Sequence, residues 1–259
     1  MQEIIFFGNG PLSEYALEGL ADYKIIFHAH TREDLEEAVR LKEANPEAIG
    51  VLASFGVLIP SSVLEVFEPE GILNIHPSLL PLYRGASPIE SAILAGNTEF
   101  GVSVMKLVPE MDAGPIYNQA TFSNPPLDKD FLYRELAHAG AAMISSILKT
   151  GEWPKAVPQD NAKATFCGKL DKSMSYLTPE TDTAEQTLRK IVAFSGYPKA
   201  KYTFYGKNCI ILEAHILDSG ETAPVSLPCA DGVSLSIDFL QPEGKKPMDA
   251  KSFLNGYAK

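Results

Sequence analysis

The sequence predicts an α/β fold in which a Rossmann-like, parallel-sheet domain is followed by a small β-barrel domain. Over residues 1–155, short apolar segments of strand length alternate with segments whose apolar residues recur at helical spacing. This alternation is typical of parallel sheets with right-handed crossovers. A polar, proline-bearing stretch over residues 156–164 indicates a linker. In residues 165–259, strand-like runs are separated by glycine turns, which favours a small barrel.

The first crossover contains a glycine turn. Glu3–Phe7 has the composition of a buried strand, Gly8-Asn9-Gly10-Pro11 follows, and an amphipathic helix begins near Ser13. A dinucleotide-binding fingerprint would need a third glycine near Ser13 and an acid after the next strand, and it has neither. We therefore interpret the glycines as permitting a tight turn, with Gly10 close to any ligand bound at this edge.

Further segments complete both domains. The helix after the second strand is predicted to open at a capping box, Thr31-Arg-Glu-Asp34, and to end at Asn45-Pro46. The other strands of the first domain are predicted over Lys24–His28, Ile49–Ser54, Gly71–Ile75, Gly101–Leu107 and Pro115–Phe122, and its later helices over Ala86–Gly96 and Asp128–Leu148. The second domain is predicted to contain a helix over Thr183–Phe194 and strands over Lys201–Tyr205, Asn208–His215 and Val233–Leu240.

Composition and charge limit the class of protein. The net charge is −11, which argues against non-specific nucleic-acid binding as the main activity. Residues 160–259 hold 12 basic and 12 acidic side chains, so the first 159 residues carry all of the negative charge. An RNA backbone would therefore meet least repulsion in the second half. Three well-separated cysteines predict neither a disulfide framework nor a metal site, and no signal peptide or membrane span is predicted.

Polar side chains follow the strand predicted at Gly71–Ile75. Asn74 and His76 are two residues apart, so on a strand they leave on the same face. In parallel sheets, ligands bind beyond the carboxyl ends of the strands, where these two residues fall. Asp112 lies on a later turn. Singly, each has a structural interpretation: His76 could cap backbone groups, Asp112 could form an Asx-turn, and Asn74 could satisfy buried backbone. Together they predict an active site.

The stretch HPSLLPLYRGASPIESAILAG, with MDAGPI after it, resembles the folate-dependent formyltransferases. These enzymes carry an Asn-x-His at a strand end, a Ser-Leu-Leu-Pro loop and an Asp on a later loop. The sequence of this stretch is most similar to those members that formylate initiator methionyl-tRNA. The closing segment, LQPEGKKPMDAKSFLNGY, extends the resemblance over nearly the whole chain. The resemblance implies an OB-like barrel as the second domain, which helps to hold tRNA.

The resemblance also implies chemistry and partners. The donor would be 10-formyltetrahydrofolate, the acceptor the amino group of initiator methionyl-tRNA, and the catalytic residues Asn74, His76 and Asp112. Asn74 would donate to the formyl oxygen, His76 would donate or relay protons, and Asp112 would orient His76 or accept the amine proton. No metal is expected, and we expect a cytoplasmic monomer that does not bind membranes. The residues predicted to bind substrate or folate are Ser78, Leu79, Leu80, Pro81, Tyr83, Arg84, Gly85 and Gly10.

One departure from the family leaves alternatives open. Between the second strand and its helix the family usually inserts a long basic loop that touches the tRNA acceptor end, and here only His28-Ala-His-Thr-Arg32 is present. This favours, as alternatives, a formyltransferase acting on a small amine such as an amino-sugar nucleotide, or a folate- or tRNA-binding protein without catalysis. With water replacing the amine, the same three residues would also suit a formylfolate hydrolase.

Overall fold

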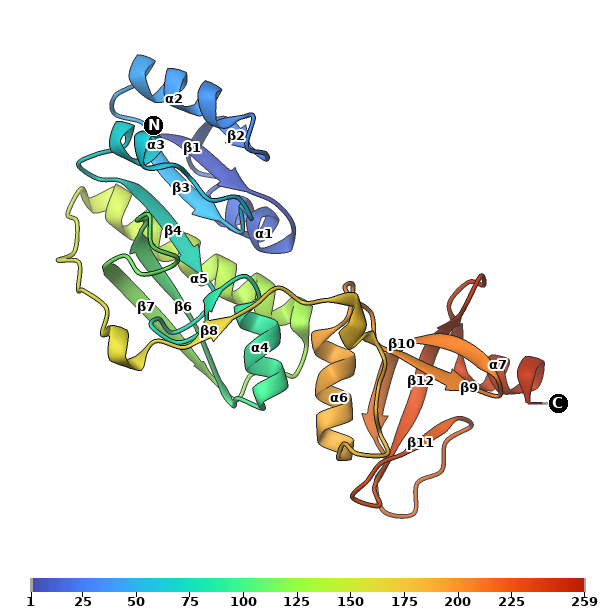
Figure 1. The fold of residues 1–259 in the computed structure, drawn as a ribbon. Coiled ribbons are helices and arrows are strands. Elements are labelled where there is room, and N and C mark those ends of the chain that lie inside the picture. Colours follow the sequence, from blue (N-terminus) through green and yellow to red (C-terminus); the bar gives the residue numbers. More distant parts are fainter. Residues whose placement is uncertain (1, 259) are drawn as a thin grey trace. The chain divides into compact units, whose positions relative to one another are not determined.

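The computed structural model describes residues 2–258, which form two compact units, each with its own sheet (Figure 1). The first unit consists of two segments of the chain, one that runs to Ile89 and one over Thr98–Gly168. The second unit consists of Glu90–Asn97 and the chain from Lys169 on. Among the residues described, no helix is both long enough and apolar enough to cross a membrane.

The sheet of the first unit has six strands in the order β2-β1-β3-β4-β6-β7. Neighbours among the first four strands pair in parallel and the last two continue the sheet antiparallel, which confirms the predicted parallel sheet. The carboxyl ends of the parallel strands therefore meet at one edge. The strands are β1 (Glu3–Gly8), β2 (Lys24–Ala29), β3 (Ile49–Ala53), β4 (Ile72–His76), β6 (Glu99–Lys106) and β7 (Ile116–Ser123).

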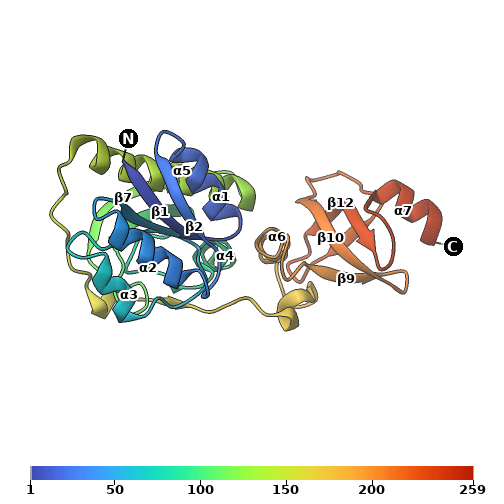
Figure 2. The same ribbon diagram turned by 90° about the horizontal axis from the view of Figure 1, so that it is seen from above.

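Helices cover both faces of this sheet (Figures 1 and 2). On one face α1 (Pro11–Gly19) packs against α5 (Lys129–Thr150), and on the other α2 (Leu35–Ala44) lies beside α3 (Ser61–Val66). The core under α2 and α3 is formed by alternate side chains of β1 and β3 together with those of the two helices: Ile5, Phe7, Leu52, Leu35, Val63 and Leu64. Alternation along the strands thus divides the apolar side chains between two layers.

Two helix starts differ from those predicted. α1 begins at Pro11, not near Ser13, because proline suits the first helical position, where no amide hydrogen is needed. α2 begins at Leu35, so the predicted capping box at Thr31 is wrong. The Asp34 carboxylate instead accepts from the backbone N–H groups of His30 and Thr31, both at 2.8 Å, and closes a turn before the helix.

The segment predicted to be a linker is hydrogen-bonded into the first unit. Val157 forms a β-bridge with Ile116, and the short strand β8 (Phe166–Cys167) pairs in parallel with β5 (Arg84–Gly85). Between them lies the single 3₁₀ turn of Asn161–Lys163. Because of these pairings the compact unit continues to Gly168, past the boundary predicted at residue 155.

The second unit is built on an antiparallel sheet in the order β11-β12-β10-β9, with β13 paired to β12. The helix predicted at Thr183 is confirmed, and Thr183 and Gln186 form its reciprocal capping box. The 3₁₀ turn Lys172–Ser175 precedes that helix, and most of α4 (Pro88–Ala95) belongs to this unit. The remaining elements are α6 (Ala184–Ala193), β9 (Lys201–Phe204), β10 (Lys207–Ile216), β11 (Ser226–Pro228), β12 (Ser234–Pro242), β13 (Met248–Asp249) and α7 (Ala250–Tyr257).

Candidate active site

Asn74 and His76 lie at the carboxyl end of β4, two residues apart and on the same face of the strand. Both are buried, with exposed fractions of 4% and 5%. Among residues 2–258 the Asn74 side-chain amide has no hydrogen-bond partner. Because buried amides are normally paired, the N–H groups of Asn74 are available to a bound molecule.

The ring of His76 is held by the loop that follows β4. Its Nε2 lies 2.9 Å from the carbonyl oxygen of Tyr83, so Nε2 carries the proton and donates it to that carbonyl. Its Nδ1 faces Oδ2 of Asp112 at 3.8 Å, which is too long for a direct hydrogen bond. A neutral His76 therefore presents a free lone pair on Nδ1.

Asp112 is placed by its backbone and by a second hydrogen bond. Its φ of 47° lies in the left-handed region, which Asp and Asn occupy more readily than most residues. Oδ2 accepts a hydrogen bond of 2.8 Å from the backbone N–H of Gly85. The same oxygen thus faces the imidazole and anchors the loop that contacts it. The predicted Asn74, His76 and Asp112 therefore belong to one site, together with the predicted Tyr83 and Gly85.

A glutamine that the sequence analysis missed holds the Asp112 turn. Nε2 of Gln159 donates to the carbonyl oxygens of Asp112 and Gly114, at 2.8 and 2.7 Å. Oε1 of Gln159 accepts two hydrogen bonds from the Arg84 guanidinium, at 3.0 and 2.7 Å, and Asn161 accepts a third at 2.8 Å. Gln159 lies in the predicted linker, where no local pattern distinguishes it from other polar residues.

Arg84, predicted as a substrate contact, is 4% exposed and belongs to this internal network. Among residues 2–258 its hydrogen-bond partners are neutral amide oxygens and not carboxylates, so its positive charge stays near the Asp112 turn. Gly10 lies on the exposed turn after β1, and an added Cβ there would meet no atom within 4 Å. The Gly10 carbonyl accepts a hydrogen bond of 3.1 Å from the Glu14 N–H at the start of α1.

The Ser-Leu-Leu-Pro loop is fixed from within. The Ser78 hydroxyl donates to the carbonyl oxygen of Leu82 at 2.6 Å. Ser103 on β6 donates to the Ser78 carbonyl at 2.6 Å and accepts from the Leu80 N–H at 3.0 Å. Gln119 adds hydrogen bonds to the Leu80 carbonyl and the Ser103 hydroxyl. The side chains of Ser78 and Leu80 therefore shape the loop from inside, whereas Leu79 and Pro81 are half-buried at its surface.

No group of three His, Cys, Asp or Glu side chains is arranged as a metal site in the part of the chain that the structure describes. Asn74, His76 and Asp112 bring an amide donor, an imidazole and a carboxylate to the end of β4. These groups can stabilise a developing oxyanion and accept or deliver a proton.

Comparisons with known proteins identify the family of the chain. A formyl transferase family description matches residues 13–148, and its C-terminal domain description matches residues 169–258. A methionyl-tRNA formyltransferase of Dehalococcoides mccartyi is 35% identical over 260 residues, covering 95% of this chain and 81% of that protein.

Two solved structures share the fold. HypX from Aquifex aeolicus in complex with tetrahydrofolic acid has a TM-score of 0.77 at 19% identity, covering 100% of this chain and 48% of that one. Methionyl-tRNA formyltransferase from Clostridium thermocellum has a TM-score of 0.67 at 17% identity, covering 96% and 100%. The sequence matches and the fold place this chain in the formyltransferase family, among the methionyl-tRNA formyltransferases.

Proposed function

We propose that the protein transfers a formyl group from 10-formyltetrahydrofolate to the amino group of initiator methionyl-tRNA, as a step of translation initiation. The observation that carries this proposal is the 35% identity to a methionyl-tRNA formyltransferase over 95% of the chain. The gathering of Asn74, His76 and Asp112 at the end of β4 supports it independently.

The site suits a formyl donor because it offers an unpaired amide beside a rigid loop. The donor supplies an electrophilic formyl carbon bound to nitrogen. Asn74 would donate to the formyl oxygen, where negative charge develops. The loop Leu79–Gly85 would hold the folate ring, with Leu79 and Pro81 offering half-buried apolar surface. A loop already fixed by Ser103 loses little freedom when it binds a ligand.

His76 and Asp112 would handle the proton of the attacking amine. His76 donates Nε2–H to Tyr83, so its free Nδ1 can accept the proton as the amine nitrogen bonds to the formyl carbon. Asp112 at 3.8 Å would stabilise the imidazolium that forms. His76 would then return the proton to the nitrogen from which the formyl carbon departs, so that charge and protons balance.

An assay with separate acceptors tests the assignment. The purified protein is given 10-formyltetrahydrofolate with charged initiator tRNA, with an amino-sugar nucleotide, or with no amine. We expect formylmethionine on the tRNA and little product in the other two reactions. Formyl found only on the sugar would contradict the proposed acceptor, and release of formate alone would indicate a hydrolase.

One observation favours the amino-sugar alternative. β2 ends at Ala29 and α2 begins at Leu35, so the connection that carries the basic loop in the family has no room for it here. A small acceptor would need no such loop. The comparison of acceptors above decides between the two.

The second unit would serve as the RNA-binding domain, and we propose that its antiparallel sheet is an OB-like barrel. The first unit would be the catalytic domain, with residues 156–164 bracing the site and the chain passing into the second unit at Lys169. We also propose a cytoplasmic monomer that does not bind membranes, consistent with a role in translation. Light scattering on a sizing column measures the oligomeric state, and a dimer mass would contradict this part.

A further inference from the structure

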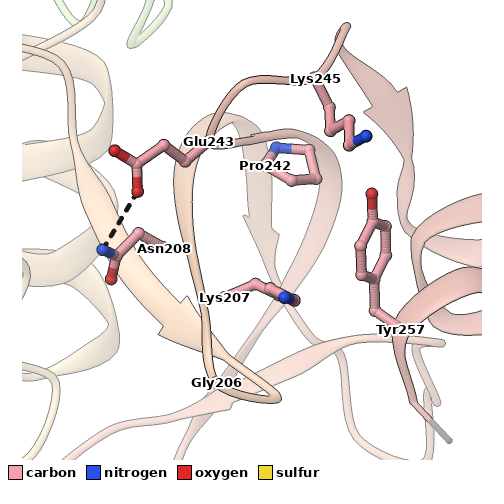
Figure 3. Close-up of a pocket in the computed structure, with 7 residues that line it drawn as sticks. All are labelled: Gly206, Lys207, Asn208, Pro242, Glu243, Lys245 and Tyr257. Carbon is pink, nitrogen blue, oxygen red and sulfur yellow. Dashed lines mark hydrogen bonds between the residues drawn. The ribbon is translucent and has the colours of Figure 1, made fainter.

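The antiparallel pair of β10 and β12 in the second unit carries different side chains at its two ends. At one end lies a pocket of about 310 Å³, where Glu243 accepts a hydrogen bond of 3.4 Å from Asn208 (Figure 3). At the other end, His215 of β10 lies opposite Ser236 of β12, and the loop over residues 217–225 leads from there to β11. All of these residues belong to the second unit.

Both ring nitrogens of His215 face carboxylates. Nδ1 lies 2.8 Å from Oδ2 of Asp238, on β12, and Nε2 lies 3.2 Å from Oε1 of Glu221, in the loop. A protonated imidazole has an N–H group on each nitrogen and can donate to both carboxylates at once, whereas a neutral imidazole has only one. The charged form of His215 therefore joins the loop to the sheet.

The two carboxylates are anchored differently. Asp238 lies on a strand, and its other oxygen accepts a hydrogen bond of 2.8 Å from Ser236. Glu221 lies in the loop, and its other oxygen accepts from the backbone N–H of Asp218, in the same loop, at 3.0 Å. When His215 loses a proton, the remaining N–H stays in the shorter bond, to Asp238. The lone pair on Nε2 then faces the Glu221 carboxylate, and because that contact is repulsive the loop loses its link to β10.

The charges around His215 decide which form is present at a given pH. Asp238 from β12 and Glu221 from the loop raise its pKa above the ordinary value of 6.5, the hydrogen bond to Asp238 being the larger cause. On its own strand the nearest charged residue is Glu213, and in the loop it is Asp218, so these neighbours are acidic as well. The charged form is therefore present at and below pH 6.5, and the neutral form appears as pH rises through the raised pKa.

We propose that His215 is a pH-sensitive latch, whose imidazolium holds the loop over residues 217–225 to the sheet through Glu221 and whose neutral form releases that loop while keeping Asp238. The proton that leaves passes from Nε2 to water, and no other covalent bond changes. The strands stay paired, so the latch alters the mobility of one loop of the second unit and not its fold.

NMR on the full chain measures the titration and the release together. The ring C–H shift of His215 gives its titration curve, and relaxation of the Ala223 methyl group gives the order of the loop from pH 5.5 to pH 9.5. Ala214, on β10, is the internal reference. We expect Ala223 to be ordered at low pH and to become mobile with the same midpoint as the His215 titration, while Ala214 does not change.

Two variants separate the latch from a general effect of pH. Glu221→Gln should keep the loop ordered at every pH, because an amide accepts from the charged ring through its oxygen and, turned over, donates to the neutral ring through its nitrogen. The matched control is Glu243→Gln, which removes a carboxylate at the pocket end of the same strand pair and should behave as the wild type (Figure 3). A loop whose order does not change as His215 titrates, or changes equally in Glu221→Gln, overturns the proposal.

Discussion

Replacing Gln159 should separate the support of the active site from its chemistry. Gln159→Met keeps a similar volume but removes both donors and the acceptor. It loses the two hydrogen bonds to the Asp112 and Gly114 carbonyls and the two from Arg84. Arg84, only 4% exposed, keeps its hydrogen bond to Asn161. At about 1 kcal/mol for each lost bond, and more for those from a charged group, we expect unfolding to become about 3–5 kcal/mol easier.

The same change should slow formyl transfer. The Asp112 turn has a left-handed φ of 47° and loses two of the bonds that hold it. A misplacement of about 1 Å at a reacting group costs roughly 10²-fold in rate. We therefore expect kcat to fall about 10²-fold with little change in the KM for the folate. Gln159→Glu should behave similarly, because it still accepts from Arg84 but turns a carboxylate oxygen toward two carbonyls.

A double-mutant cycle identifies the route of the effect. If Gln159 acts through Asp112, then Asp112→Asn/Gln159→Met should be no slower than Asp112→Asn alone. Gln186→Met serves as the matched control, since that glutamine caps α6 in the second unit and should leave kcat unchanged. Wild-type kcat in Gln159→Met, or rate losses that simply multiply in the double variant, would refute the reasoning.

Three further predictions follow. Asn74→Ala removes the amide proposed to face the formyl oxygen and should lower kcat about 10²–10³-fold without loss of folate binding, as measured by steady-state kinetics and equilibrium titration; an unchanged kcat would reject that role. Gly114→Ala should give a protein that folds poorly or lacks activity, because the added methyl group would overlap the Lys106 carbonyl oxygen. Circular dichroism and the formyl-transfer assay measure the two effects. The pKa of His215 is raised above its ordinary value of 6.5 by its hydrogen bond to the Asp238 carboxylate and, to a smaller extent, by the one to Glu221. The stability that this group contributes is therefore fully present below pH 6.5 and is lost as pH rises through the raised pKa. In urea titrations, His215→Gln should lower the free energy of unfolding at pH 5.5 but not at pH 9. An equal loss at both pH values would contradict this prediction.

Much of the fold was predictable because it depends on short-range patterns. The apolar run ending at Asn74 and His76 defines a buried strand and places both side chains on one face. Gln159 was not predictable, because its partners lie 75, 47 and 45 residues away and meet it only after the chain returns across the sheet. The start of α2 was predicted wrongly for a different reason. The Asp34 carboxylate accepts hydrogen bonds from the backbone of the turn before the helix, so the helix begins after Asp34 and Thr31 does not cap it.

The single-turnover rate of formyl transfer to charged initiator tRNA tests the central claim most directly, with folate donor and tRNA both saturating. We predict that His76→Ala and Asp112→Asn each slow this step by about 10²-fold or more while the dissociation constant of the folate stays near that of the wild type. A near wild-type rate in either variant would contradict the account.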